Sequence, residues 1–494
     1  MPFLLPDDEL PQATAPWIAS ARWFGGKALS DVRFRVHDLA PAAAHDGPVA
    51  LAVIDVQAAA PGDEPLRYAV PLEAVAAPTA ATPVLRDAAG SPAFADWLVR
   101  TVLDGGTVRG RRGEFRGHAI GPAIPLPAGA LPAVTPIGGD ASNTSLVVRW
   151  GDRSVIVKLL RRCREGVQPE VEIGGFLAGQ AGWRESPRLL GWLEYVETTP
   201  DDAPAGVPAL TAIATVHACV PGGESAWDRL VSLLTAADPH GREGRGPGAE
   251  ALRLAAALGH STARMHRALG GRDDVPAFAP RPMTPAMRCE AATRMADHAR
   301  EVFSLAAARL PYLPAATADR LRKLLPARDR LVARLRELAD IETTAAVIRV
   351  HGDYHLGQVL VGGATPSDQA DDRLFIIDFE GEPGRPLAER RAATSVFKDV
   401  AGMCRSFDYL LRHVTAGTGT ASRPADLRRL EESFLEAYAA AASGQPWWPT
   451  DPREAERLLG VYKLDKAVYE LAYEIQNRPD WIAVPLGALE EMAT

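Results

Sequence analysis

The hydrophobic pattern of the chain changes abruptly near residues 217–223, and this change limits the fold more than any other feature. Before it, segments such as 32–40 and 66–75 alternate or run apolar between Ala-, Pro- and Gly-rich connectors, which is typical of β-strands. After it, segments such as 250–269 and 318–341 carry apolar residues at helical spacing. The sequence therefore predicts a β-rich first half and a mostly helical second half. A chain of 494 residues is long enough for two or three packed units.

Charge and cysteine content narrow the possible partners and the cellular setting. A formal net charge of −8 argues against general binding to nucleic acid or to an anionic membrane. No segment reaches the roughly 20 apolar residues of a membrane span. The cysteines, Cys163, Cys219, Cys289 and Cys404, are far apart and show no C-x-x-C spacing. We therefore expect free thiols in a reducing cytoplasm, and neither a disulfide framework nor a metal cluster.

Residues 347–363, VIRVHGDYHLGQVLVGG, place polar residues between two apolar, β-branched runs. The pattern predicts a hairpin whose loop presents Asp353, a carboxylate able to act as a general base or to orient a hydroxyl nucleophile. The alternative is an ordinary hairpin with an Asx-type turn and solvated acids. His351 is expected to form structural hydrogen bonds, because Asp353 already fits the role of the base. The role of His355 stays open.

An adjoining strand is predicted at residues 374–383, LFIIDFEGEP, where an apolar run ends in three acidic residues. Its Asp378, together with Gln358 from the preceding segment, offers a carboxylate and an amide oxygen. These hard oxygen ligands suit Mg²⁺ held jointly with substrate phosphates. On the alternative interpretation, Glu380 and Glu382 belong to a solvated acidic loop. The presence of both segments favours a single site.

Phosphoryl transfer also needs a loop that cradles phosphates and a cation that binds them. Residues 137–148, IGGDASNTSLVV, lie between strand-like segments and combine two glycines with small hydroxyl and amide side chains. Lys158 lies near the end of the following apolar strand, and either Glu170 or Glu172, in the helix predicted at 168–180, is placed to pair with it. This order of strand, lysine, helix and glutamate holds the α- and β-phosphates in protein kinases.

Four segments carry a family resemblance: HGDYHLGQVL (351–360), FIIDFEGEP (375–383), AERRAATSVFKDVAGMCRSFDYL (388–410) and YELAYEIQNRPDWIAVPL (469–486). Together they resemble the actinobacterial maltokinase family and its glucosamine kinase relatives, within the aminoglycoside-phosphotransferase-like, protein-kinase-like group. RWFGGK (22–27) and SNTS (142–145) are similar to that family's N-terminal cap and phosphate loop. The resemblance covers nearly the whole chain and is strongest from about residue 345 onward.

The resemblance implies an α+β, bilobal protein-kinase-like fold with a β-rich N-terminal cap and N-lobe and a mostly helical C-lobe. It places the cap domain at residues 1–115. The N-lobe, with the phosphate loop, Lys158 and a hinge at its end, would occupy residues 116–220. The C-lobe, with the catalytic and metal loops, would occupy residues 221–494. The implied cofactors are ATP and Mg²⁺.

The same resemblance implies a role for each site residue. Asp353 is the catalytic base, and Gln358 and Asp378 hold the metal. Lys158 binds the ATP phosphates, with Glu172 as its expected partner. The other nucleotide-binding residues are Ser142, Asn143 and Thr144 in the phosphate loop and His217, Ala218, Cys219 and Val220 in the hinge.

Sugar selectivity is assigned mainly to the C-terminal segment. The predicted sugar-binding residues are Glu380, Asp408, Tyr473, Glu474, Gln476 and Trp481. The acids among them would suit the ammonium group of an amino sugar, and Trp481 would stack on a sugar ring. The alternative places Tyr473 and Trp481 in the core. Arg390 and Arg391 are expected to form ion pairs beside a helix.

These features predict a cytoplasmic, monomeric, ATP-dependent kinase whose partner is a small sugar and which binds neither nucleic acid nor membrane. The main expectation is a maltokinase that makes maltose 1-phosphate. Two departures from the family's usual sequence, EIQNRP at 474–479 and ASNTS at 141–145, keep open a glucosamine kinase that makes glucosamine 6-phosphate. An aminoglycoside phosphotransferase and a non-catalytic, kinase-like protein that binds sugar or nucleotide are further alternatives.

Overall fold

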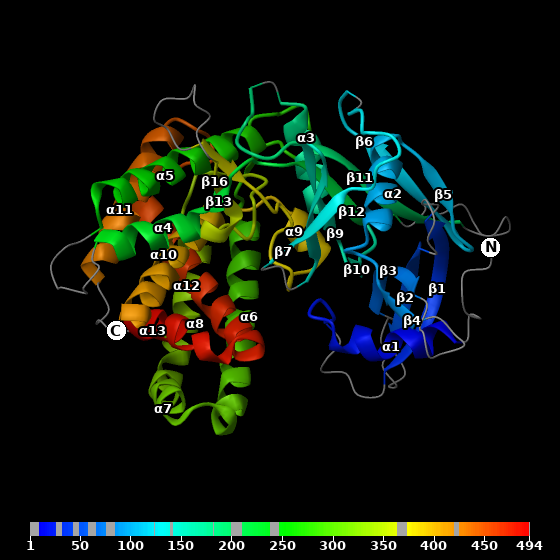
Figure 1. Ribbon diagram of the computed structural model, residues 1–494. Helices are drawn as coiled ribbons and strands as arrows, with labels where there is room; N and C mark the ends of the chain where they lie inside the picture. Colours follow the sequence, from blue (N-terminus) through cyan, green and yellow to red (C-terminus); the bar gives the residue numbers. More distant parts are fainter. Residues whose placement is uncertain are drawn as a thin grey trace. The chain divides into compact units, whose positions relative to one another are not determined.

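A computed structural model of the protein describes residues 9–25, 32–42, 49–57, 66–75, 84–122, 124–138, 142–180, 182–198, 210–237, 247–362, 373–418 and 424–493. The chain divides into two compact units (Figure 1). The first contains Met1–Val220 and Pro383–Leu387, and the second contains Pro221–Glu382 and Ala388–Thr494. Their boundary falls where the hydrophobic pattern changes, because strands and helices bury apolar residues at different spacings. Within these described ranges, no helix has both the length and the apolar character needed to cross a bilayer.

The first unit contains two antiparallel sheets. The smaller one is formed by β1 (Arg33–Ala42), β2 (Val49–Gln57), β3 (Leu66–Val75) and β10 (Arg162–Cys163) in that order, with β4 (Val84–Asp87) also paired to β3. Strand β2 is buried from Val49 to Val56, which explains its mostly apolar sequence; the buried Asp55 within it pairs with Arg35 and Arg67. Helix α1 (Leu10–Ser20) adds Leu10 and Ile18 to the core of this sheet.

The larger sheet has seven strands and carries the predicted nucleotide-binding residues. Its order is β5 (Thr107–Arg109), β6 (Gly113–Ala119), β11 (Leu189–Glu197), β12 (Leu210–Ala218), β9 (Arg153–Leu159), β8 (Thr144–Trp150) and β7 (Ala133–Ile137). Helix α2 (Pro92–Leu103) packs against β6, and α3 (Pro169–Ala178) packs against β11. Gly117 permits the close approach of α2, because a Cβ there would lie 1.9 Å from the carbonyl oxygen of Thr101. The predicted boundary between residues 115 and 116 falls inside β6, and the division into cap and N-lobe stays a prediction.

The second unit is mostly helical. Its helices are α4 (Ala226–Ala237), α5 (Ala249–Leu269), α6 (Pro285–Arg309), α7 (Ala315–Leu324), α8 (Arg328–Arg336), α9 (Leu387–Arg391), α10 (Phe397–Thr418), α11 (Pro424–Ala442), α12 (Pro452–Asn477) and α13 (Ala483–Met492). Helix α5 packs along α11, and α12 packs against α10 and α6 (Figure 1). Gly259 lets α5 and α11 approach closely, because a Cβ there would lie 2.2 Å from the carbonyl oxygen of Phe434.

Short strands hold the predicted catalytic segments in the second unit. Strand β15 (Ala346–Val347) pairs with β14 (Arg281–Pro282), whereas β16 (Val359–Gly362) pairs with β13 (Glu224–Ser225) and β17 (Arg373–Ile376). The hairpin predicted within residues 347–363 is therefore wrong. A polar turn and the 3₁₀ helix η4 (Leu356–Gln358) separate its two apolar runs, which join different sheets. The β16–β17 pairing confirms that residues 374–383 adjoin this segment.

Candidate active site

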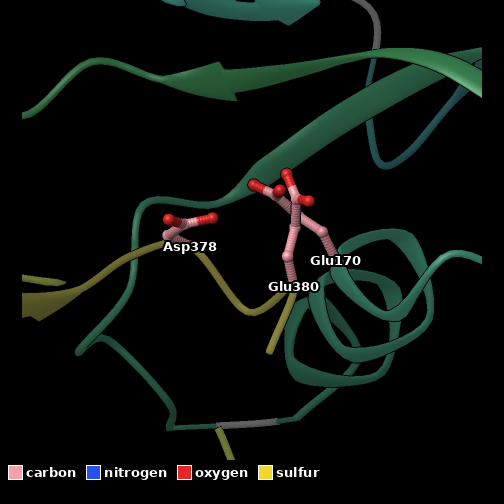
Figure 2. A group of neighbouring side chains, drawn as sticks. All are labelled: Glu170, Asp378 and Glu380. Atoms are coloured by element: carbon pink, nitrogen blue, oxygen red, sulfur yellow. The ribbon is translucent and has the colours of Figure 1, made fainter. Parts of the chain in front are cut away.

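Lys158 lies in a buried ion pair on the larger sheet of the first unit. Its Nζ is 2.9 Å from Oε2 of Glu170, which occupies the first turn of α3 (Figure 2). The other carboxylate oxygen of Glu170 is 3.2 Å from Nε2 of His217 on β12. Burial raises the pKa of Glu170, but Lys158 and His217 outweigh burial and hold the pKa below its ordinary value. A fixed negative charge at Glu170 thus positions the ammonium group of Lys158.

This ion pair corrects the expectation that Glu172 is the partner of Lys158. The buried face of α3 carries Glu170, Ile173 and Leu177, which follow helical spacing. Glu172 is turned by roughly 200° from Glu170 around the helix axis. The sequence left both glutamates possible, and the side of α3 that is buried decides between them.

The predicted phosphate loop leads into β8, directly beside the strand of Lys158. In the β8–β9 register, Ser145 lies opposite Lys158. Ser142 and Asn143 immediately precede β8, and Thr144 is its first residue. The register therefore brings the three predicted phosphate-contacting residues to the end of the strand that presents the cation.

Arg161 connects this loop with the smaller sheet. Its guanidinium is buried; Nε donates to the hydroxyl of Thr144 (2.9 Å), and Nη2 donates to the carboxylate of Asp87 (2.6 Å). The ring of Trp23 lies 4.8 Å from the guanidinium carbon. These residues line an open hollow of about 370 Å³. Residues 139–141 of the predicted loop lie outside the described residues.

The predicted hinge begins at the end of β12, and two of its residues are already engaged. His217 uses its ring in the ion pair with Glu170. The N–H of Ala218 donates to the carbonyl oxygen of Arg188 (2.9 Å), while the role predicted for Ala218 in the hinge stays a prediction. Cys219 and Val220 follow the strand and are half-buried. The role of their backbone in binding the nucleotide base stays a prediction.

In the second unit, Asp353 lies in a tight turn between β15 and η4. The carboxylate of Asp399 holds this turn, because it accepts hydrogen bonds from the backbone N–H groups of His351 and Gly352, both at 2.8 Å. Gly352 has a φ of +90°, which residues with side chains rarely adopt. Nε2 of His351 donates to the carbonyl oxygen of Ile377 (2.9 Å). His351 therefore has the structural role predicted for it.

Asp399 itself was not found by sequence reasoning. It is fully buried near the start of α10, and Oδ2 lies 3.1 Å from Nε2 of His266, whose Nδ1 is 2.8 Å from the hydroxyl of Tyr438. Burial raises the pKa of Asp399, but the hydrogen bond and the charge of His266 contribute to holding it below its ordinary value. The available signal in the sequence was one acid on a helix face whose other residues are apolar or small.

Lys466 on α12 is a second residue that sequence reasoning missed. Its Nζ lies 2.9 Å from Oδ1 of Asp353 and 2.9 Å from Oε1 of Glu382. Burial raises the pKa of Asp353, but Lys466 and His355 lower it, and the net effect is a pKa below the ordinary value. The available signal was the spacing of eight residues between Lys466 and Glu474, which places both on one helix face.

Gln358 and Asp378 lie side by side in the second unit, and their donor atoms fit a magnesium ion. Nε2 of Gln358 donates to Oδ2 of Asp378 (2.7 Å), which leaves the amide oxygen of Gln358 for a ligand. Among the described residues other than glycine, Asp378 alone has a positive φ, 67°. Such strain is typical of functional sites. Figure 2 shows Asp378 and Glu380 on the loop that follows β17.

His355, whose role was left open, caps η4. Its Nδ1 accepts a hydrogen bond from the N–H of Gly357 (3.1 Å). Burial lowers the pKa of His355, although the negative charge of Asp353 opposes this effect. The imidazole is therefore neutral near pH 7, and its hydrogen bond fixes the backbone just before Gln358.

The acidic run after β17 is buried, so its interpretation as a solvated loop is wrong. Glu380 is 8% exposed and Glu382 is 3% exposed. Nη1 of Arg390 donates to the carbonyl oxygen of Glu380 (2.9 Å) and lies 3.8 Å from its carboxylate. The ion pair predicted for Arg390 is thereby confirmed. A role for Glu380 toward the sugar stays a prediction.

Among the predicted sugar-binding residues, Asp408 is paired with two arginines, and its role toward the sugar stays a prediction. Its Oδ2 lies 2.6 Å from Arg405 and its Oδ1 lies 2.7 Å from Arg412. Arg405 is in turn 2.8 Å from Glu470 on α12. Both carboxylate oxygens of Asp408 are thus used in a buried network of charges between α10 and α12, where buried ions need such partners.

Glu474 and Trp481 lie close together at the end of α12. The carboxylate of Glu474 is buried and accepts hydrogen bonds from Arg478 (2.6 and 3.0 Å) and from the hydroxyl of Tyr409 (3.1 Å). The indole of Trp481 stacks with Tyr409 and His413, at centroid distances of 6.1 and 5.7 Å. Trp481 is therefore partly packed in the interior, as the alternative interpretation held.

Tyr473 and Gln476 are exposed on other faces of α12. Tyr473 lies 5.2 Å from the guanidinium carbon of Arg478. Gln476 is two residues beyond Glu474, which turns it by roughly 200° around the helix. Gln476 therefore lies on a different face of α12 from Glu474, and its predicted role toward the sugar stays a prediction.

Sequence comparison places these residues in a known family. Residues 133–381 match the phosphotransferase enzyme family. The chain is 31% identical over 423 residues to a glucosamine kinase of Streptacidiphilus jiangxiensis, which covers 81% of this chain and 86% of that protein. The chain belongs to the phosphotransferase enzyme family. This phosphotransferase is also 27% identical over 366 residues to a glucosamine kinase of Mycolicibacterium smegmatis, covering 72% of this chain and 78% of the relative.

Solved structures support the same placement. A glucosamine kinase in complex with glucosamine, ADP and inorganic phosphate is similar to this phosphotransferase with a TM-score of 0.60 and 25% identity, over 94% of both chains. A second glucosamine kinase structure has a TM-score of 0.61 and covers 98% of this chain. The predicted α+β, protein-kinase-like fold and the predicted enzyme class are confirmed. Membership of the maltokinase branch is not supported by these relatives.

The residues of this phosphotransferase form two chemical sets, one in each unit. In the first unit, Lys158 and the start of β8 supply a buried cation and small polar groups suited to a polyphosphate. In the second unit, Asp353 supplies a carboxylate, and Gln358 with Asp378 supplies oxygen ligands. A base, a metal site and a phosphate-binding cation are the parts that phosphoryl transfer requires.

Proposed function

We propose that the protein is an ATP- and Mg²⁺-dependent kinase that phosphorylates glucosamine. The observation that carries this proposal is the 31% identity with a glucosamine kinase across most of both chains. A relative of similar architecture binds glucosamine and ADP, which supports an amino sugar as acceptor and ATP as donor. Maltose, the main expectation from the sequence, is replaced by the alternative that the relatives favour. We assign the product as glucosamine 6-phosphate.

Asp353 acts on the acceptor hydroxyl in this reaction. The carboxylate orients the 6-hydroxyl of the sugar toward the γ-phosphorus of ATP and takes its proton as transfer proceeds. A bond forms between the sugar oxygen and the γ-phosphorus, the bond from that phosphorus to the bridging oxygen breaks, and ADP leaves. The reaction is thus accelerated mainly by the positioning of the two reactants.

Two sets of residues offset the negative charge on the phosphoryl group that is transferred. Lys158, whose position is fixed by Glu170, binds the phosphates of ATP. Gln358 and Asp378 would hold Mg²⁺, which neutralises negative charge on the phosphates when bound. Glu474, a buried acid on α12, and Glu380, on the loop after β17, are the groups we assign to the amino sugar.

The proposal is tested by measuring ADP release with separate acceptors. Purified protein, ATP and Mg²⁺ are incubated with glucosamine, maltose, glucose or an aminoglycoside. We expect the highest kcat/KM with glucosamine, and we expect ³¹P and ¹H NMR of the product to place the phosphate on the 6-oxygen. EDTA should abolish the reaction and added Mg²⁺ should restore it.

Two variants complete the assay. Asp353→Asn should lower kcat by about 10²–10⁴-fold, the usual contribution of a positioned base. Asp319→Asn removes an exposed acid on α7 and should leave kcat unchanged. Faster turnover of maltose would return the protein to the maltokinase assignment. ADP release with none of the sugars would favour a binding protein, and full activity of Asp353→Asn would refute the role of that residue.

A further inference from the structure

Lys466 contacts the catalytic carboxylate from a helix far along the chain. Its Nζ lies 2.9 Å from Oδ1 of Asp353 and 2.9 Å from Oε1 of Glu382, and its side chain is 13% exposed. The second oxygen of Glu382 is 3.4 Å from Nζ of Lys398 on α10. Asp353, Glu382, Lys466 and Lys398 thus form an alternating chain of two carboxylates and two ammonium groups.

The two carboxylates explain why a lysine is needed at this position. Asp353 and Glu382 approach the same ammonium group, and two neighbouring acids in a partly buried site oppose each other's ionisation. Lys466 removes that conflict, because one cation satisfies both acids at once. Lys398 then supplies a second cation to Glu382, which leaves the four side chains electrically balanced.

The contact with Lys466 uses only one oxygen of Asp353. Among the described residues, Oδ2 of Asp353 makes no hydrogen bond to protein, whereas Oδ1 is held by Lys466. An aspartate with two free torsions has several orientations of similar energy, and fixing one oxygen selects one of them. The anchored Oδ1 therefore determines where Oδ2 points.

We propose that Lys466 is a positioning residue for phosphoryl transfer: it holds Oδ1 of Asp353 so that Oδ2 faces the acceptor hydroxyl, and Glu382 with Lys398 holds Lys466 in turn. The inference rests on the kinase function proposed above. It also explains how Asp353 works. A carboxylate that is already paired with an ammonium group is a weak base, and it is better suited to orient a hydroxyl than to deprotonate it early. In a loose transition state the bond to the attacking oxygen is only slightly formed, so orientation of the hydroxyl matters more than early removal of its proton.

The structure offers a matched control on the same helix. Lys463 lies one turn before Lys466, is also partly buried and pairs with Glu431 at 2.7 Å. Replacing either lysine by methionine removes one ammonium group and one ion pair from α12 while keeping an unbranched side chain. Loss of stability alone should therefore affect both variants alike.

The test compares kcat and KM for Lys466→Met, Lys466→Arg and Lys463→Met. For Lys466→Met we expect kcat to fall by about 10–100-fold, with KM for sugar and ATP within about threefold of the original, because a positioning interaction acts in the transition state. Lys466→Arg should restore part of kcat. Lys463→Met should keep kcat, whatever its melting temperature.

A double variant distinguishes an effect of Lys466 that acts through Asp353 from an independent effect on kcat. If Lys466 acts through Asp353, then Asp353→Asn combined with Lys466→Met should be no slower than Asp353→Asn alone. Multiplied losses would overturn the proposal, as would equal kcat values for Lys466→Met and Lys463→Met.

The pH profile gives a readout that a purely structural lysine would not change. The charged or titratable groups that act on Asp353 are Lys466, Glu382 and His355. Removing Lys466 takes away the ammonium group that lowers the pKa of Asp353 and leaves the opposing charge of Glu382 in place, so the acidic limb of the kcat profile should move to higher pH. An unchanged limb would count against the proposal.

The acceptor for these assays is whichever sugar gives the fastest ADP release with the original protein. Failure of the glucosamine assignment therefore leaves the test of Lys466 intact. An original protein that is inactive with every acceptor would refute both proposals. An active original protein with unimpaired Lys466→Met would refute this one alone.

Discussion

Lys158 and Lys466 illustrate how much a single buried charge constrains its neighbours. Lys158 is paired with Glu170, and Lys466 is paired with Asp353 and Glu382. Removing an ammonium group from water costs several kcal/mol unless a partner compensates. Each buried lysine therefore needs a carboxylate beside it. In the first unit, Glu170 is that carboxylate.

At this residue scale, Glu170 and Glu172 form a matched pair for mutation. Glu170→Gln should raise KM for ATP by about tenfold or more, because Lys158 loses the charge that positions it. Glu172→Gln should change KM for ATP by less than about threefold. Steady-state kinetics with varied ATP measures both. Equal effects would contradict the assignment of Glu170 as the functional partner.

A second prediction at the residue scale concerns pH. The folded pKa of Asp399 lies below its ordinary value, so Asp399 contributes stability above the unfolded pKa and loses it as pH falls through the folded pKa. Asp399→Asn should lower the free energy of unfolding near pH 7 by about 3–5 kcal/mol. The difference between variant and original should shrink below roughly pH 5. Urea unfolding at about pH 7, 4 and 2.5 measures it, and a constant difference over that range would contradict the account.

Helix α10 is the element that supports the turn at residues 351–354, which carries Asp353. Asp399 at its start accepts the backbone hydrogen bonds of the turn. One turn further on, Gly402 allows the helix backbone to touch the turn, since a Cβ there would lie 2.5 Å from the carbonyl oxygen of Tyr354. Ser406, another turn along α10, accepts a hydrogen bond from the N–H of Leu356 (3.1 Å). Successive turns of one helix therefore fix the chain from His351 to η4.

At this element scale, we expect Gly402→Ala to separate α10 from the turn that carries Asp353. The added methyl group should cost about 1–3 kcal/mol through overpacking and should lower kcat as Asp353 shifts. Gly460→Ala on α12 is the control, because nothing lies within 4 Å of a Cβ there. It should be neutral or should stabilise the protein by up to about 1 kcal/mol. Thermal unfolding and kcat of both variants test this; similar results for the two would argue against close packing at Gly402.

At the scale of the whole molecule, the chain is organised as two units with separate cores. In the first unit, Arg161 connects the sheets: it contacts Asp87 at the end of β4 and Thr144 at the start of β8. The guanidinium also lies under the ring of Trp23, which belongs to the segment after α1. A single side chain thus couples the N-terminal segment to the predicted phosphate loop.

Replacing Arg161 should therefore affect both stability and nucleotide binding. Arg161→Met should lower the free energy of unfolding by about 3–5 kcal/mol, since it leaves Asp87 without its buried partner, and it should raise KM for ATP. Arg86→Met removes an arginine that pairs with Glu73 at an exposed position, and it should change the free energy of unfolding by less than about 1 kcal/mol. Unfolding curves and ATP kinetics distinguish the two. An unchanged KM for ATP in Arg161→Met would show that the contacts of Arg161 with Thr144, Asp87 and Trp23 do not influence the predicted phosphate loop.

The sequence by itself determined where most of the strands and helices form, and it singled out the residues that are predicted to carry the chemistry. The strands within residues 32–75 and the helices after Pro221 follow from hydrophobic spacing, because burial imposes a period of two on strands and 3.6 on helices. Asp353, Gln358, Asp378 and Lys158 stand out because they are polar residues within or directly after apolar, strand-like segments, where a buried polar group needs a partner.

Only the tertiary structure decided which charges meet. The choice of Glu170 over Glu172 depended on which face of α3 is buried, and the structural role of Asp408 depended on arginines one turn away on either side. Lys466 reaches Asp353 across 113 residues of sequence. The hairpin predicted around Asp353 failed for the same reason, because its strands found partners elsewhere in the chain. Contacts between distant segments form through packing, and the spacing within one segment does not say which distant segment it will contact.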